Sequence, residues 1–236
     1  MYSVSWRKDT LSSRFQTLVI VLHIYQMDIE KIVYINLQHR TERKQNIENE
    51  LSKVFPPEQI QRFNAIKDQR GSIGCTKSHI AVLEMAIQQK WKNILIMEDD
   101  MKWFDTFESR LPLLKKKLQE DYDVIVLAGG TPVYNTETLK LVKCHCTGAY
   151  IVHSSYYTIL LQNFKEGLVQ LEAYYGTTEL HNIDMYWQRL QEKDNWYLVQ
   201  LLYNPPGFSD IKNIHMNYDT HFGLKQLRRK FGFWKK

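Results

Sequence analysis

Residues 93–100 (NILIMEDD) decide the fold that this sequence predicts. Four apolar residues, 94–97, run directly into three successive carboxylic acids, Glu98, Asp99 and Asp100. A short apolar run bounded in this way is typical of a strand buried on both faces of a parallel sheet. In open α/β sheets, ligands gather beyond the carboxyl ends of the strands. The stretch therefore predicts a buried strand that delivers an acidic triplet (Glu98, Asp99 and Asp100) to a binding site.

Strand and helix patterns alternate on both sides of this stretch. The predicted strands cover residues 32–37, 63–66, 94–97, 124–127, 147–152 and 197–203. The predicted helices cover residues 41–55, 78–91, a segment that starts at Pro112, 155–164 with an end near Gly167, and 183–190. Residues 71–79 are expected to form a glycine-containing loop that enters a helix. This alternation predicts an α/β sandwich with a largely parallel central sheet.

The composition is that of a globular protein with one main domain. The chain has 236 residues, of which 44% are hydrophobic and 24% charged, enough sequence to bury a sizeable core. An apolar run at residues 15–25 (FQTLVIVLHIY) is shorter than the roughly 20 residues that a membrane-spanning helix needs. No small-residue cleavage site follows it. We expect residues 1–27 to be an extension, with Met27 as a hypothetical native start, and the protein to be cytoplasmic or peripheral to a membrane.

The positive charge of the chain is concentrated in its last twelve residues. Residues 225–236 contain six of the basic residues and no acid. The rest of the chain has 25 basic and 26 acidic residues, so the formal charge of +5 comes from this tail. A near-neutral body argues against nucleic-acid binding. The aromatic residues interleaved in the tail allow two interpretations. One is contact with an anionic membrane or a partner, and the other is a solvated helix end docked by its aromatic side chains.

The three cysteines, Cys75, Cys144 and Cys146, do not form a disulfide framework. The one-residue spacing between Cys144 and Cys146 is too short for the usual zinc pattern. Alternation on a half-buried strand explains this pair better, and the low cysteine count favours a reducing compartment.

The acidic triplet predicts a metal site. Three adjacent carboxylates repel one another, and burying them without partners costs several kcal/mol. A hard divalent cation such as Mg²⁺ or Mn²⁺ relieves that cost and keeps positions open for a diphosphate. Strand alternation places Glu98 and Asp100 on one side and Asp99 on the other. The competing interpretation is a solvated acidic turn.

Three further polar segments point to a nucleotide or sugar ligand. Residues 36–43 (NLQHRTER) follow the first strand and place Arg40 or Arg43 near a phosphate at a helix N-terminus. Residues 71–79 (GSIGCTKSH) combine hydroxyl, ammonium and imidazole groups but do not match a Walker loop. Asp184 lies at the start of a predicted helix, where it serves either as a functional carboxylate or as a simple cap.

Six segments in this order resemble glycosyltransferase family 25. They are residues 32–43 (IVYINLQHRTER), 74–83 (GCTKSHIAVL), 94–100 (ILIMEDD), 147–152 (TGAYIV), 182–184 and 209–211. The family includes lipooligosaccharide galactosyltransferases and collagen hydroxylysine galactosyltransferases. The resemblance implies a GT-A fold, with residues 28–224 as the glycosyltransferase domain. It also implies a UDP-galactose or UDP-glucose donor, dependence on Mn²⁺ (or Mg²⁺) and inversion at the anomeric carbon.

The resemblance also assigns roles by position. Glu98 and Asp100 correspond to the metal–diphosphate site, with His215, preferred over His221, as a third metal ligand. Asp184 corresponds to the base that accepts the proton of the acceptor hydroxyl. The residues expected to line the donor site are Asn36, Arg40, Ser78, His79 and Asp99.

The expected reaction is transfer of galactose or glucose to a hydroxyl on a glycan or on collagen-like hydroxylysine. Two alternatives remain open from the sequence. One is a non-catalytic sugar-nucleotide-binding module of the same fold, and the other is a metal-dependent phosphohydrolase.

Overall fold

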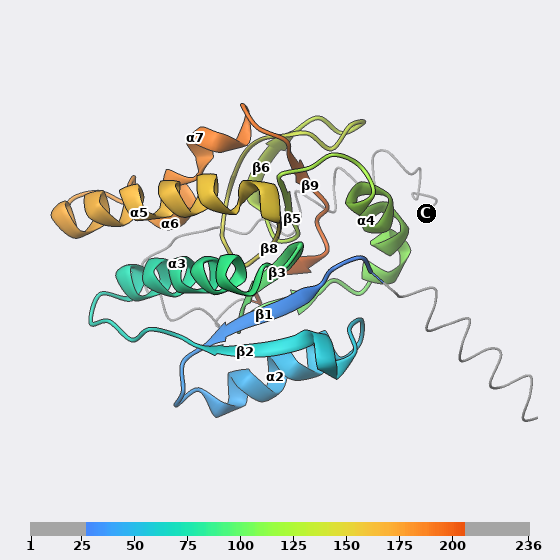
Figure 1. Cartoon of the computed structure of the whole chain (residues 1–236), viewed down its shortest axis with the longest axis horizontal. Helices are drawn as coiled ribbons and strands as arrows, with labels where there is room; N and C mark the ends of the chain where they lie inside the picture. Colours follow the sequence, from blue (N-terminus) through green and yellow to red (C-terminus); the bar gives the residue numbers. More distant parts are fainter. Residues whose placement is uncertain (1–26, 206–236) are drawn as a thin grey trace, which may run out of the picture.

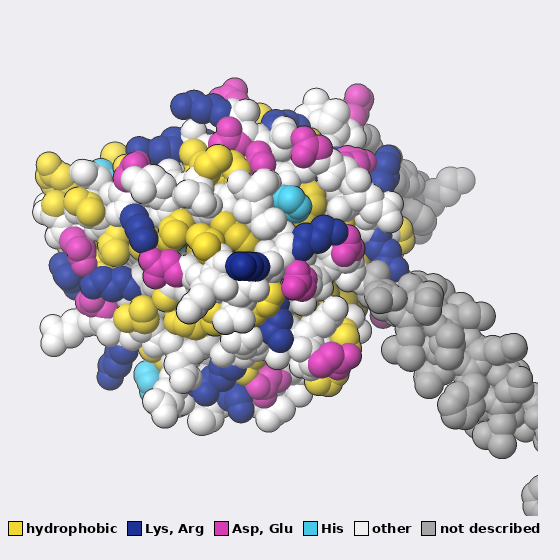
Figure 2. Space-filling model, viewed as in Figure 1, with side chains coloured by type: hydrophobic (Ala, Val, Ile, Leu, Met, Phe, Trp, Pro, Cys, Tyr) yellow, Lys and Arg dark blue, Asp and Glu magenta, His cyan; other side chains and the backbone are white. Residues whose placement is uncertain are grey.

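The computed structural model of the chain describes residues 27–205 (Figure 1). The predicted extension apart from Met27, the basic tail, the 209–211 motif and His215 lie outside these residues. Within the described part, no helix is both long enough and apolar enough to cross a membrane. Figure 2 shows basic and acidic side chains interspersed over one face, with hydrophobic side chains in small groups between them.

A six-stranded sheet forms the centre of the fold, in the order β2-β1-β3-β8-β5-β9. Strand β8 runs antiparallel to both of its neighbours, β3 and β5, and the other strand pairs are parallel. This confirms the predicted α/β sandwich with a largely parallel central sheet. The strands are β1 (Lys31–Asn36), β2 (Ile60–Asn64), β3 (Asn93–Glu98), β5 (Val124–Val126), β8 (Ala149–His153) and β9 (Trp196–Leu198).

Helices cover both faces of this sheet (Figure 1). Alternate residues of β3 divide between two cores: Leu95 packs with helices α2 and α4, and Ile96 packs with helices α3 and α5. Both faces are therefore buried, which explains the unbroken apolar run of this strand. The helices are α2 (Thr41–Leu51), α3 (Gly71–Gln89), α4 (Leu111–Leu118), α5 (Tyr157–Ala173), α6 (Ile183–Tyr186) and α7 (Gln188–Gln191), with 3₁₀-helices η1 (Pro57–Gln59), η2 (Phe107–Arg110) and η3 (Ser154–Tyr156).

Two small antiparallel sheets accompany the central one. Strand β4 (Lys102–Trp103) pairs with β10 (Leu202–Tyr203), and β6 (Gly130–Tyr134) pairs with β7 (Leu141–His145). The prediction of one strand over residues 197–203 was wrong, because β9 and β10 belong to different sheets. The alternating-cysteine interpretation holds for Cys144 alone, since β7 ends before Cys146, which has a φ of 76°.

Several predicted helix boundaries were also wrong. Residues 71–77 are the first turns of α3 rather than a loop. Helix α5 continues six residues beyond Gly167, to Ala173. Gly167 lies there because α5 crosses α6 closely: a Cβ at this position would be 2.9 Å from ring atoms of Tyr186. The single helix predicted over residues 183–190 is instead the two short helices α6 and α7.

Candidate active site

The acidic triplet lies at the carboxyl end of β3. In the central sheet, β3 lies between β1 and β8. The side chain of Glu98 is 30% exposed, whereas those of Asp99 and Asp100 are 11% and 8% exposed. Carboxylates this buried need partners or a cation. The triplet is therefore not a solvated turn.

Glu98 is held from the side of β8. The hydroxyl of Thr147 donates to Glu98 Oε1 at 2.9 Å, and the backbone N–H of Glu98 donates to the carbonyl of Gly148 at 2.8 Å. His79 Nε2 lies 3.4 Å from the same Oε1 atom. Burial raises the pKa of Glu98, but His79, Thr147 and Arg43 outweigh it, so the pKa lies below its usual value. Glu98 is thus held as a carboxylate.

Asp99 is held from the opposite side, where β1 ends. The side-chain amide of Asn36 donates to Asp99 Oδ2 at 2.7 Å, and Arg43 Nη1 donates to Asp99 Oδ1 at 3.1 Å. Asn36 is itself fixed: its amide also donates to the Arg40 carbonyl, and its Oδ1 accepts from Arg62. Burial raises the pKa of Asp99 despite these two donors. Asn36 and Asp99, both predicted donor-site residues, are therefore in direct contact.

Asp100 has the least exposed side chain of the triplet. Arg43 Nη1 lies 3.8 Å from its Oδ2, while its buried Oδ1 accepts no hydrogen bond from any residue in the described range 27–205. Burial, followed by the charges of Glu98 and Asp99, raises the pKa of Asp100 to about 7, and Arg43 and Asn204 offset this only in part. A buried, unsatisfied carboxylate oxygen beside two more carboxylates fits a hard divalent cation.

Asp184 lies on α6 in the electrostatic neighbourhood of the triplet. Its Oδ2 accepts a hydrogen bond from the backbone N–H of Cys146 at 3.1 Å. The N-cap of the helix is Asn182, whose side chain makes no capping hydrogen bond. Burial raises the pKa of Asp184, and the negative charge of Glu98 adds to this effect. A carboxylate with a raised pKa is a stronger base.

One short segment, residues 146–148, contacts both Glu98 and Asp184. Its first residue donates a backbone hydrogen bond to Asp184, its second donates a hydroxyl to Glu98, and its third accepts the Glu98 N–H. The segment can do this because β8 is antiparallel to β3, which places its beginning beside the carboxyl end of β3. The positions of the two carboxylates are therefore coupled through this backbone.

The structure separates the roles of Ser78 and His79. The Ser78 hydroxyl donates to the carbonyl of Gly74 at 2.7 Å and accepts from the N–H of Ile66 at 2.8 Å, so it joins α3 to the loop before it. His79 is fully buried, and its Nδ1 lies 2.8 Å from Tyr150 Oη. His79 is the one of the pair that faces the triplet, through Glu98.

Arg40 and Arg43 lie at the start of α2, where Arg40 is the N-cap. The structure brings Arg43 rather than Arg40 to the triplet. Sequence reasoning did not single out Thr147, although it lies in the 147–152 motif, nor Tyr150 as the partner of His79. Their roles depend on the pairing of β8, which the sequence pattern does not specify.

A surface cavity of about 310 Å³ opens beside this site, at the carboxyl ends of β1 and β2. It lies next to Asn36 along the chain, and Asn36 contacts Asp99. The cavity is therefore adjacent to the Asp99 side of the triplet. Its lining residues are Leu37, Gln38, His39, Asn64, Ala65 and Lys67.

The chain is similar in structure to two solved proteins. One is described as a glycosyltransferase involved in the glycosylation of the major capsid of PBCV-1, with a TM-score of 0.49 and 8% identity, covering 74% of this chain and 92% of that one. The other is described as mannose-1-phosphate geranyltransferase from Thermus thermophilus, with a TM-score of 0.42 and 12% identity, covering 74% of this chain and 75% of that one.

The sequence comparisons are more specific. Residues 69–179 match the profile of glycosyltransferase family 25 (LPS biosynthesis protein). A "Glycosyltransferase 25 family member" from Drosophila pseudoobscura pseudoobscura is 25% identical over an alignment 139 residues long, and the match covers 47% of this chain and 22% of the fly protein. This chain thus matches only about a fifth of that relative's length. The segment that carries the acidic triplet is therefore the part of the chain that is similar to glycosyltransferase family 25.

Proposed function

We propose that this chain is a metal-dependent, inverting glycosyltransferase that moves galactose or glucose from a UDP-sugar to a hydroxyl acceptor. The observation that supports this most is the buried acidic triplet, in which Asp100 Oδ1 accepts no hydrogen bond from residues 27–205. The acceptor would be a glycan or a collagen-like hydroxylysine.

Glu98 and Asp100 would hold Mn²⁺ or Mg²⁺, with His215 as a further candidate ligand outside the described residues. When bound, the ion supplies charge neutralisation for the leaving diphosphate. Asp99 would orient the site rather than bind the ion, since both of its oxygens already accept hydrogen bonds from Asn36 and Arg43.

The nucleotide would lie along the end of β1. The cavity lined by residues 37–39 is adjacent to Asn36 and includes the basic side chain of Lys67. Arg40 and the N-terminus of the eleven-residue helix α2 add positive potential for phosphates. This arrangement supports a nucleoside diphosphate donor.

Asp184 would accept the proton of the acceptor hydroxyl as the sugar moves. An inverting displacement needs one base on the side from which the acceptor attacks. Burial makes Asp184 more basic, and the 146–148 segment fixes it relative to Glu98. His79 and Ser78 would then support the donor site from behind, through packing and through the contact of His79 with Glu98.

The test is release of UDP from a panel of UDP-sugars, with and without Mn²⁺ and with each acceptor. Acceptors would be a hydroxylysine-containing collagen peptide and oligosaccharides that end in galactose or glucose. We expect release that requires Mn²⁺, one donor and one acceptor. Asp105, which is exposed, provides the control variant Asp105→Asn. Release without any acceptor would favour a phosphohydrolase, and donor binding without release would favour a non-catalytic module.

A further inference from the structure

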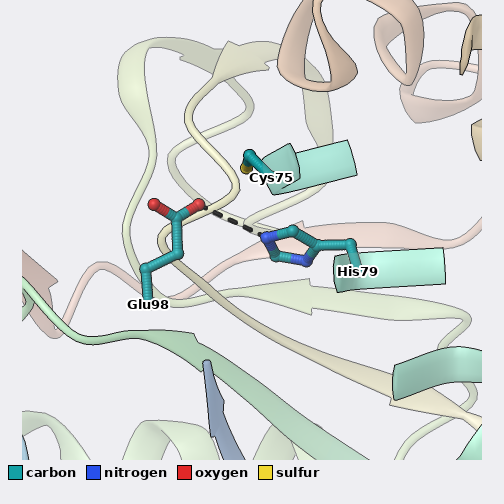
Figure 3. A group of neighbouring side chains, drawn as sticks. All are labelled: Cys75, His79 and Glu98. Carbon is teal, nitrogen blue, oxygen red and sulfur yellow. Dashed lines mark ion pairs between the residues drawn. The ribbon is translucent and has the colours of Figure 1, made fainter. Parts of the chain in front are cut away.

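A second group of metal-ligating side chains lies beside the acidic triplet, toward α3 (Figure 3). Cys75 and His79 are one turn apart on α3, and both point toward Glu98 at the end of β3. The sulfur, a ring nitrogen and a carboxylate oxygen of these residues all lie within 4.8 Å of one another. Sulfur and nitrogen ligands distinguish this group from the all-oxygen triplet.

His79 has a buried nitrogen directed into this group. The side chain is fully buried, and Nε2 makes no hydrogen bond with any residue of the described part of the chain. Its distance of 3.4 Å from Glu98 Oε1 is longer than the roughly 2.7–3.2 Å of a well-formed N–H···O hydrogen bond. Buried polar atoms without a partner are rare in folded proteins and require an explanation.

The geometry of His79 matches that of a metal ligand. Nitrogen and oxygen ligands each about 2.1 Å from a tetrahedral zinc ion lie about 3.4 Å apart, which is the distance observed between Nε2 and Oε1. The other ring nitrogen, Nδ1, is 2.8 Å from Tyr150 Oη. If Nδ1–H donates to the Tyr150 hydroxyl, the Nε2 lone pair is free for a metal. Metal-ligating histidines are commonly held in this way, with the second ring nitrogen donating to an outer-shell partner.

We propose that Cys75, His79 and Glu98 form a three-ligand site for Zn²⁺, with a fourth position open. Zinc is the borderline-soft ion that accepts sulfur, nitrogen and oxygen together, whereas Mg²⁺ prefers oxygen alone. On binding, the Cys75 thiol releases its proton to solvent and the sulfur bonds to zinc. A thiolate and a carboxylate then balance the two charges of the ion, and no oxidation occurs.

Zinc at this site is expected to oppose the metal of the triplet, because both use Glu98. This consequence rests on the proposed function, whereas zinc binding itself does not. If the chain transfers sugar with Mn²⁺, added Zn²⁺ should inhibit the wild type, and Cys75→Ala should require at least about 10-fold more Zn²⁺ for the same inhibition. Equal inhibition of both would overturn the regulatory role.

The binding test uses Co²⁺ as an optical probe of the metal-free full chain. We expect a sulfur-to-cobalt charge-transfer absorption in the near ultraviolet that Zn²⁺ removes by displacement. Cys75→Ala should abolish the band and weaken Zn²⁺ binding by more than about 10-fold. Cys146→Ser is the matched control and should keep the band, because Cys146 is also partly buried and its backbone N–H contacts the nearby carboxylate of Asp184. A band that survives in Cys75→Ala, or that disappears only in Cys146→Ser, would overturn the assignment.

A second measurement applies to the wild type alone, in case Cys75→Ala does not fold. Alkylation of the native chain, followed by peptide mapping, reports on each cysteine separately. Zn²⁺ should slow alkylation of Cys75 at least about 10-fold and leave Cys146 unchanged. Equal alkylation of Cys75 with and without Zn²⁺ would refute the site.

Discussion

Replacing Asp100 with asparagine should stabilise the metal-free protein at neutral and alkaline pH. The side chain is 8% exposed, and burial together with the charges of Glu98 and Asp99 raises its pKa to about 7. Between about pH 4 and pH 7 the folded chain keeps a proton that the unfolded chain has lost, so the free energy of unfolding falls as the pH rises. Above pH 7 the full free-energy cost of burying the charged Asp100 side chain is present.

The size of this penalty follows from the shift. A rise of about three pKa units corresponds to at most about 4 kcal/mol at 1.36 kcal/mol per unit. Asparagine has the shape of aspartate without its charge, so Asp100→Asn should recover much of that energy at about pH 8 and almost none at about pH 4. Added Mn²⁺ should reverse the order, because only the wild type gains stability from binding the ion.

The assay is denaturant unfolding of both proteins across this pH range, with a chelator or with Mn²⁺. Asp105→Asn is the control: Asp105 is exposed and this variant keeps Asp100, so its stability should follow that of the wild type across the pH range and with Mn²⁺. The reasoning would be refuted if wild type and Asp100→Asn lost stability in parallel as the pH rose. It would also be refuted if Mn²⁺ stabilised both equally.

Three further variants test separate parts of the structure. Glu98→Gln should destabilise the folded chain at pH 7, because the folded structure lowers the pKa of Glu98 and so favours its charged form. This contribution to stability is present above the ordinary pKa of a glutamate and is lost as the pH falls. Equal free energies of unfolding for the wild type and the variant at pH 7 would contradict this. Asp184→Asn should lower kcat on the order of 10²–10⁴-fold with little change in donor affinity, and an unchanged kcat would exclude Asp184 as the base. Gly167→Ala should cost about 1–3 kcal/mol of stability through its contact with Tyr186, whereas Gly71→Ala, where a Cβ meets no atom within 4 Å, should cost nothing measurable.

The central strand could be predicted from sequence because both of its faces are buried. Ile94 and Ile96 pack on one core and Leu95 and Met97 on the other, which leaves no polar position to interrupt the run. The hairpin of β6 and β7 gave no comparable signal. It contains Pro132 and a register shift, and only part of each strand is buried.

The site also has features that the sequence predicts and features that it does not. The acidic triplet is contiguous, so its chemistry was visible in the sequence. The contacts of Glu98 with Thr147 and His79 depend on the pairing of Met97 with Ala149 and on how α3 lies across the sheet. Such contacts between residues tens of positions apart are set by tertiary packing, which no local pattern encodes.

The reversed direction of β8 has a consequence for interpreting inactive variants. Side chains of a strand alternate between faces, so a slip of one residue turns each to the opposite side. Such a slip in β8 would move Tyr150 away from His79 and Thr147 away from Glu98, while the hydrophobic residues on either side could still fill both cores. A conservative change deep in this strand could therefore abolish the proposed transfer activity without unfolding the chain. A mutation that abolishes activity would then act through the register between two strands rather than through a residue that touches substrate.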